Sequence, residues 1–145
     1  MSALQDRPSV RRLRDALVAA GSSAQVIELA ETARTAADAA ASLGVEQGAI
    51  VKSLVFAALG RALNIAGKVE RADADLVRQA TGYSIGGVAP LGHPTHLALA
   101  IDSSLARFAT VYAAAGHPHC VFATSADELA TLTGGVVVEG IGIEI

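Results

Sequence analysis

Aromatic side chains are scarce in this sequence of 145 residues, in which 3% of the residues are aromatic and tryptophan is absent. The core must therefore be built mainly from alanine, valine, leucine and isoleucine. Proteins that bind nucleic acid by base stacking present exposed aromatic rings for the purpose. The scarcity of such rings argues against a base-stacking platform.

The sequence also lacks a second cysteine and any long apolar run. Cys120 is the single cysteine, so no internal disulfide can form, which fits a reducing compartment. No apolar run approaches the ~20 residues that a membrane helix requires. Residues 1–14 are polar, with four arginines and no hydrophobic stretch after them. We expect a soluble, cytoplasmic protein.

Composition indicates one packed domain over residues 1–145, because 52% of the residues are hydrophobic and 17% are charged. The net charge of −3 argues against extended wrapping by a polyanion. Two local basic clusters are present nevertheless, and solvated helix faces are the commoner explanation of such clusters. Their members are Arg7, Arg11, Arg12 and Arg14, and then Lys68, Arg71 and Arg78.

Strand patterns outnumber helix patterns along the chain. We expect an amphipathic helix that begins with Ser9 as its N-cap and stops at Gly21, and capping-box helices that begin after Thr35 and Ser125. A further helix is expected over residues 73–81. Strands are expected over residues 25–29, 50–57, 63–66, 97–101, 110–113, 120–123 and 136–138. Several strands are separated by only a few residues, which favours an α+β fold with a mixed sheet.

Lys52 interrupts the apolar run over residues 50–56 (IVKSLVF). In a strand it shares a face with Ile50 and Leu54, so it is paired, has a perturbed pKa or meets an anionic ligand. The alternative is an edge-strand lysine whose ammonium reaches water. Adjacent strand residues point to opposite faces, which makes a Ser53–Lys52 nucleophilic pair improbable.

Residues 82–92 (GYSIGGVAPLG) contain four glycines and one proline. Glycine permits positive φ and close backbone approach, so this loop can direct bare N–H groups at an anion or a carbonyl. It matches neither the dinucleotide fingerprint nor the phosphate-binding loop. An ordinary turn is the alternative reading.

The four histidines, at positions 93, 96, 117 and 119, do not predict a metal site, because their spacing lacks a convincing third ligand. We expect neither a metal nor another cofactor. His117 and His119 stand near Cys120 in the sequence, but nearness in sequence does not make a catalytic Cys–His pair. We expect Cys120 to be a buried, inert thiol.

Three segments in this order resemble the YbaK / prolyl-tRNA synthetase-associated editing-domain family: residues 51–56 (VKSLVF), residues 86–92 (GGVAPLG) and residues 100–105 (AIDSSL). The resemblance covers nearly the whole chain. It implies a mixed, mostly antiparallel sheet curved into a partial barrel with flanking helices. It also implies an enzyme that acts in trans and hydrolyses a mis-attached Ala, Cys, Ser or Thr from tRNA, with tRNA(Pro) as the usual setting.

The resemblance further implies roles for individual residues. Lys52 holds the phosphate or ribose of the terminal nucleotide, and the loop at Gly86 and Gly87 binds the aminoacyl carbonyl and stabilises the oxyanion. His119 gates the amino-acid pocket or activates water, and Asp102 positions the α-amino group unless it is only a helix N-cap. The remaining residues expected to bind substrate are Ser53, Val88, Ala89 and Pro90.

Ser53 stands where some relatives carry Asn, which leaves the amino-acid preference open. The expected partners are the acceptor end of mischarged tRNA and prolyl-tRNA synthetase, with the protein a monomer or weak dimer. A catalytically silent module that binds tRNA or a synthetase is the alternative function. Lys52 and the glycine loop would serve binding as well as hydrolysis.

Overall fold

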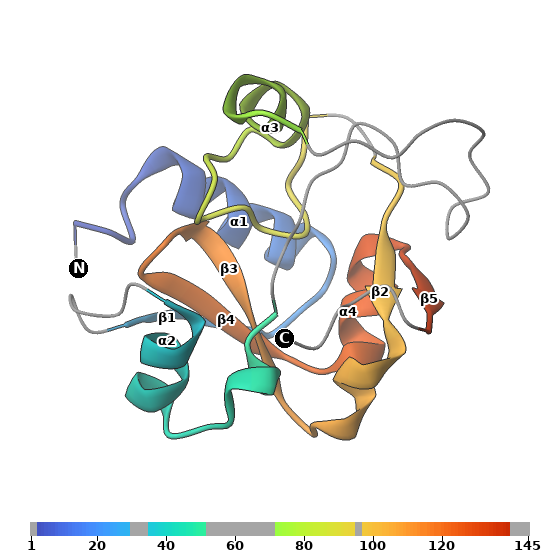
Figure 1. Cartoon of the computed structure of the whole chain (residues 1–145). Helices are drawn as coiled ribbons and strands as arrows, with labels where there is room; N and C mark the ends of the chain where they lie inside the picture. Colours follow the sequence, from blue (N-terminus) through green and yellow to red (C-terminus); the bar gives the residue numbers. More distant parts are fainter. Residues whose placement is uncertain (1–2, 30–34, 52–71, 95–96, 140–145) are drawn as a thin grey trace.

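The protein forms α-helices, short 3-10 helices and strands over residues 3–29, 35–51, 72–94 and 97–139, which the computed structural model describes (Figure 1). The helices are α1 (Pro8–Ala19), α2 (Ala36–Leu43), α3 (Ala74–Thr81) and α4 (Ala126–Thr133), with the 3-10 helices η1 (Gln47–Ala49) and η3 (Ser103–Arg107). The strands are β1 (Val26–Glu28), β2 (Ala100–Asp102), β3 (Val111–His117), β4 (Cys120–Thr124) and β5 (Val136–Val138). None of the described helices is long and apolar enough to cross a bilayer.

The described strands form two sheets. An antiparallel sheet has the order β1-β4-β3, and a parallel pair joins β2 to β5. A parallel bridge between Ile50 and Tyr112 attaches the chain before residue 52 to the first sheet. The α+β class with mostly antiparallel pairing is therefore confirmed, whereas curvature into a partial barrel stays a prediction.

Most strand predictions agree with the structure to within a few residues. β3 and β4 form a hairpin that continues beyond the expected residues, to His117 and Thr124. β2 begins only at Ala100, three residues later than expected, because it pairs with the short β5. The expected strand over residues 63–66, and residues 52–57 of the preceding one, lie outside the described residues.

Local side-chain caps begin three of the four described helices. The N–H of Asp38 donates to Thr35 Oγ1 (3.1 Å), that of Leu76 to Asp73 Oδ1 (2.8 Å), and that of Glu128 to Ser125 Oγ (3.0 Å). Each of these helices ends at a glycine with positive φ. These signals lie within a few residues of each terminus, so the sequence predicts them well.

The predicted Ser9 cap of the first helix is wrong. Arg7 is the N-cap residue of α1 and makes no side-chain cap, while Pro8 occupies the first turn. Proline has the backbone φ that a helix start requires, so the helix begins two residues earlier than expected. The Ser9 hydroxyl donates instead to the carbonyl of Gly116 at 2.7 Å, which ties α1 to the end of β3.

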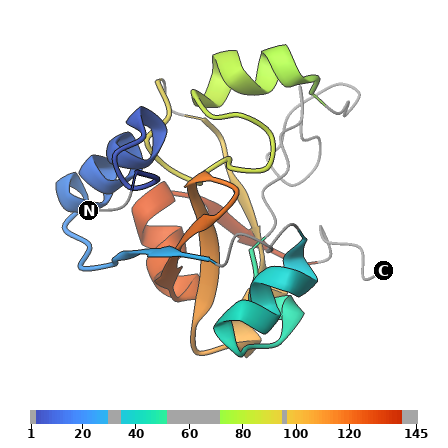
Figure 2. The ribbon, with the colours of Figure 1, turned by 90° about the vertical axis from the view of Figure 1, so that its left-hand side faces the viewer.

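α1 and α2 pack on opposite faces of the antiparallel sheet (Figure 2). On one face of the sheet, Phe122 of β4 packs in a cluster with Val10, Leu13 and Leu17 of α1. On the other face, Val121, the residue before Phe122, packs in a cluster with Ala39 of α2. Adjacent strand residues point to opposite faces, so β4 takes part in both clusters. The antiparallel sheet is thus the common wall of two small apolar clusters.

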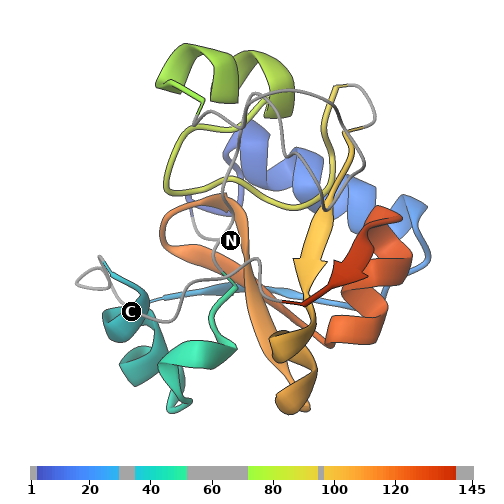
Figure 3. The ribbon, with the colours of Figure 1, turned by 45° about the vertical axis from the view of Figure 1, so that its right-hand side comes forward.

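Residues 82–92 run between α3 and the turn of the β3–β4 hairpin (Figure 3). Tyr83, Val88, Ala89 and Leu91 from this segment belong to the same buried cluster as α1. A loop anchored by buried side chains is fixed in position much as a strand would be. The fold therefore holds the glycine-rich segment firmly against the hairpin.

Candidate functional site

The glycine-rich segment begins with a tight turn over residues 84–87. The N–H of Gly87 donates to the carbonyl of Ser84 at 3.0 Å. Gly86 has φ +96°, a backbone conformation that side chains with a Cβ rarely adopt. Gly86 therefore makes the turn possible, and the N–H of Gly87 is engaged within it.

Gly87 brings this turn into contact with the hairpin. A Cβ at position 87 would lie 2.9 Å from both Cα and N of His117 and 3.1 Å from C of Gly116. A Cβ at position 86 would lie 3.5 Å from Cγ of Pro118, which is an ordinary contact. Two candidate segments about 30 residues apart in sequence thus meet at backbone distance. Gly87 is glycine because the hairpin occupies the place of its side chain.

Tyr83 holds the two ends of the loop together. Its hydroxyl donates to the carbonyl of Leu91 at 2.8 Å, and its ring is 1% exposed. Burial raises the pKa of Tyr83 above 10.0, although a hydrogen bond and the charge of Arg12 lower it in part, so the hydroxyl remains a donor. The Arg12 guanidinium lies 4.6 Å from the centre of the Tyr83 ring and also donates to the carbonyl of Gly82.

His93 closes the far end of the loop. Its Nε2 lies 2.8 Å from the carbonyl oxygen of Ala89, and its ring stands edge-on to that of Tyr83. Together with the bond from Tyr83 to Leu91, this contact fixes the carbonyl groups of Ala89 and Leu91. Among the described residues, the N–H groups of Val88 and Ala89 have no hydrogen-bond partner.

The two hairpin histidines interact with each other. The backbone N–H of His119 donates to Nδ1 of His117 at 3.1 Å, and the two rings are 5.6 Å apart. Because Nδ1 accepts a hydrogen bond, the neutral His117 ring carries its proton on Nε2. Burial lowers the pKa of His117 below 6.5, and the charges of Arg7 and His119 lower it further.

His117 is thus a candidate site residue that sequence reasoning missed in favour of His119. Its backbone contacts Gly87 directly, and its ring is held neutral in one tautomer. Nothing in the local sequence distinguishes the two histidines. Only the contact between the hairpin and the glycine turn distinguishes His117 from His119.

Asp102 has the capping role that was its alternative reading. Its Oδ1 accepts from the N–H of Ser104 at 2.9 Å and caps η3. β2 ends at this residue and points away from α3 and residues 82–92 (Figures 1 and 3). The structure therefore groups the glycine turn with the hairpin and places Asp102 elsewhere. Lys52 and Ser53 lie outside the described residues.

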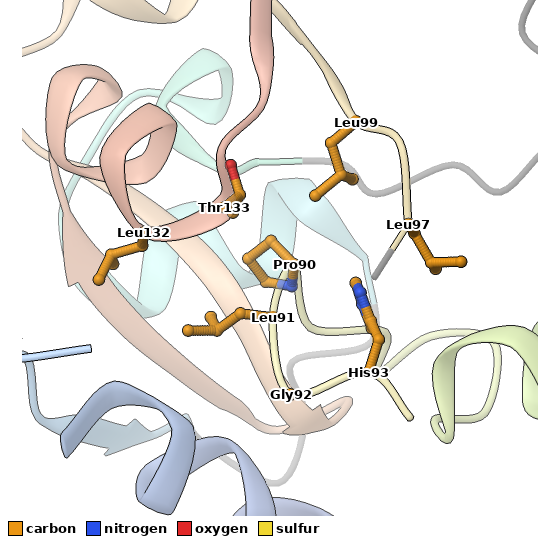
Figure 4. A pocket seen from close by; sticks show the side chains of 8 residues that line it. All are labelled: Pro90, Leu91, Gly92, His93, Leu97, Leu99, Leu132 and Thr133. Atoms are coloured by element: carbon orange, nitrogen blue, oxygen red, sulfur yellow. The ribbon is translucent and has the colours of Figure 1, made fainter. Parts of the chain in front are cut away.

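A pocket of about 190 Å³ lies beside the loop (Figure 4). Pro90, His93 and Leu99 face it, and Thr133 closes it from the end of α4. The Thr133 hydroxyl donates to the carbonyl of Leu129 at 2.7 Å and accepts from the N–H of Gly135 at 3.1 Å. Leucines contribute half of the lining residues, and the Thr133 hydroxyl is already engaged in two hydrogen bonds.

Cys120 is buried, as expected. Burial raises the pKa of its thiol to about 11, and the charge of Glu28 acts in the same direction. A thiol that stays protonated at neutral pH is a poor nucleophile. In the described part of the chain, no three His, Cys, Asp or Glu side chains are grouped as metal ligands would be.

Comparisons with known proteins agree on one family. The family model of the aminoacyl-tRNA editing domain matches residues 56–132. A crystal structure of a proposed trans-editing enzyme for prolyl-tRNA synthetase is 36% identical, with a TM-score of 0.82 over 91% of this chain and 96% of that chain.

Two further solved structures are similar. One comes from a computational design study that grafted epitope backbones onto scaffold proteins, and it is 36% identical with a TM-score of 0.85 over 92% of this chain and 97% of that chain. The other is the hypothetical protein APE2540, 29% identical with a TM-score of 0.75 over 88% of this chain and 97% of that chain.

Proposed function

This chain belongs to the aminoacyl-tRNA editing domain family, and on that premise we propose that it hydrolyses a mis-attached small amino acid from tRNA in trans. The substrates proposed are Ala, Cys, Ser or Thr esterified to tRNA, with tRNA(Pro) first among the acceptors. One observation carries the proposal. In the loop whose carbonyl groups at Ala89 and Leu91 are bound by His93 and Tyr83, the N–H groups of Val88 and Ala89 lack a hydrogen-bond partner among the described residues.

These N–H groups are suited to bind the carbonyl oxygen of the aminoacyl ester. Fixed donors stabilise the negative charge that develops on this oxygen in the transition state and need no reorganisation. The N–H of Gly87 is bonded to Ser84, so we assign the donor role to Val88 and Ala89 and a structural role to both glycines. In this proposal Pro90 limits the space beside the ester.

The hydrolysis needs one water molecule. Its oxygen attacks the ester carbonyl, the bond to the ribose oxygen breaks, and that oxygen leaves with a proton, so the products are a free amino acid and an intact tRNA end. Neutral His117 is our candidate base: Nδ1, the ring nitrogen without a proton, accepts the proton of water once it gives up its hydrogen bond from the N–H of His119. The tRNA 2′-hydroxyl is a further participant. Lys52 is proposed to hold the terminal nucleotide, and Ser53 to contact the substrate.

A panel of mischarged tRNAs tests the proposal. We expect multiple turnover on at least one of Ala-, Cys-, Ser- or Thr-tRNA, while correctly charged Pro-tRNA is spared. Folded protein that binds these tRNAs without turnover would instead be the silent binding module. Spontaneous ester hydrolysis must be subtracted at each pH.

The proposed role of His117 predicts an acidic limb in the pH profile. The pKa of His117 is lowered in the folded protein, so kcat/KM should fall only as the pH drops through a value below 6.5. By the same linkage, the stability due to neutral His117 is complete above pH 6.5 and is lost below it. We expect His117→Gln to lower kcat/KM by about 100-fold, within the range of general base catalysis, and to remove the limb.

His119→Gln is the matched control for this prediction. His119 contributes its backbone N–H, not its ring, to the bond with His117. The variant should therefore keep the acidic limb. A profile that changes with His119→Gln and not with His117→Gln would return the role to His119.

A further inference from the structure

Three arginines surround the glycine turn and the hairpin end. The Arg78 guanidinium on α3 lies 3.4 Å from Ser84 Oγ, in the turn itself. Arg12 on α1 donates to Gly82 at the start of the loop. Arg7 is the N-cap residue of α1, at the helix end that the bond from Ser9 to Gly116 ties to the hairpin beside His117. We call Arg7, Arg12 and Arg78 the arginine rim.

The hydrogen bonds and exposure of the rim arginines leave their positive charge able to attract an anion. The bonds made by Arg12 and Arg78 go to a neutral carbonyl and a neutral hydroxyl, and all three residues are exposed. Arg14, from the same helix, instead donates to Gln5 and points to another part of the chain. The N-terminal basic cluster is thus divided, and only part of it faces the candidate site.

We propose that the arginine rim binds the phosphates of the tRNA acceptor end next to the aminoacyl ester, an inference that rests on the proposed function. Guanidinium groups bind phosphate oxygens through paired hydrogen bonds. The whole chain carries a net charge of −3, so a polyanion is repelled overall and attracted only locally. The rim therefore both binds the acceptor end and orients it towards the glycine turn.

Binding of phosphates by the rim can be distinguished from ester hydrolysis with two substrates that carry the same ester. One is the mischarged tRNA, and the other is the 3′-aminoacyl adenosine, which lacks the upstream phosphates. At pH 8, where His117 is neutral, Arg7→Gln and Arg78→Gln should each lower kcat/KM on tRNA about tenfold relative to the adenosine ester. The slope of log kcat/KM against log salt should become shallower by about 0.7 for each arginine removed.

Arg107→Gln is the matched control. Arg107 is an exposed arginine on η3, at the opposite end of the molecule from α3 (Figure 1), and it too lies against an aromatic ring. Its removal changes the net charge as much as each rim variant does. It should leave the ratio of kcat/KM on tRNA to kcat/KM on the adenosine ester unchanged. An equal loss in Arg107→Gln would mean a general charge effect and would overturn the rim.

Binding of uncharged tRNA, measured in parallel by fluorescence anisotropy, keeps the inference independent of turnover. If the wild-type protein hydrolyses neither substrate, the proposed function fails, but weaker tRNA binding by the two rim variants would still support the rim. Unchanged tRNA binding and an unchanged substrate ratio would overturn it. So would a loss that appears only when a synthetase is added, since that assigns these arginines to a protein partner.

Discussion

Replacing Lys52 with alanine is expected to lower kcat/KM on the best mischarged tRNA by roughly 30-fold or more, while the protein remains folded. Losing the cationic partner of a bound anionic group costs about 2–5 kcal/mol, and each 1.4 kcal/mol is a factor of about ten. On the apolar row that the sequence predicts for Lys52, an unpaired cation would be desolvated in the empty enzyme, so we expect its removal to leave stability unchanged or higher. Single-turnover deacylation and thermal unfolding measure the two effects separately.

Two further lysine variants sharpen this experiment. Lys52→Arg should also be impaired, because a planar guanidinium does not replace a compact ammonium in a tight site. Lys68→Ala removes the other lysine of the chain and the same charge, and it should retain wild-type kcat/KM. Full activity in Lys52→Ala would remove this residue from the site and favour an edge-strand lysine in contact with water.

Features set by a few neighbouring residues were predictable from the sequence. The caps at Thr35 and Ser125, and the end of α2 at Gly44, are decided within one helical turn. Of the two roles expected for Asp102, only the N-cap depends on neighbouring residues, and the structure shows that cap at Ser104. Local hydrogen bonds form in many contexts, so sequence patterns report them reliably.

Features that depend on distant residues were not predictable in the same way. Ser9 has the sequence pattern of a cap, but its hydroxyl bonds to Gly116, which is 107 positions away. The choice of His117 over His119 as the candidate site residue depends on the close approach of Gly87 to the backbone of His117. Neither fact is encoded near the residue concerned, because each arises only when α1, the glycine turn and the hairpin pack together.

The contact of Gly87 also alters what its substitution should do. From the sequence, we expect Gly87→Val to damage catalysis more than folding, since a branched side chain would block the approach to the carbonyl. The structure places the hairpin backbone, not open space, where that side chain would be. Stability and catalysis should therefore be lost together.

Gly87→Ala is accordingly expected to lower the free energy of unfolding by about 1–3 kcal/mol, as overpacking does, and Gly87→Val by more. For a chain of this length, 1–3 kcal/mol is a fall in Tm of about 3–10 °C. The hairpin backbone cannot move aside without leaving α1, because Gly116 itself packs against Ser9. Deacylation by the remaining folded protein should also fall, since the turn and His117 are forced apart.

Gly135→Ala is the matched control for Gly87→Ala. A Cβ at position 135 would lie 2.9 Å from Cδ1 of Ile101, which is as close as the contact at Gly87. Neither glycine has a positive φ, so backbone strain does not separate the two variants. The close neighbours of Gly135 are side-chain atoms, of Ile101 and of Thr133 (Oγ1 at 3.0 Å), and not backbone, so we expect a smaller loss than in Gly87→Ala. Equal losses would mean that the hairpin yields as easily as a side chain. A destabilised Gly87→Ala with wild-type kcat/KM would mean that the turn has no part in catalysis.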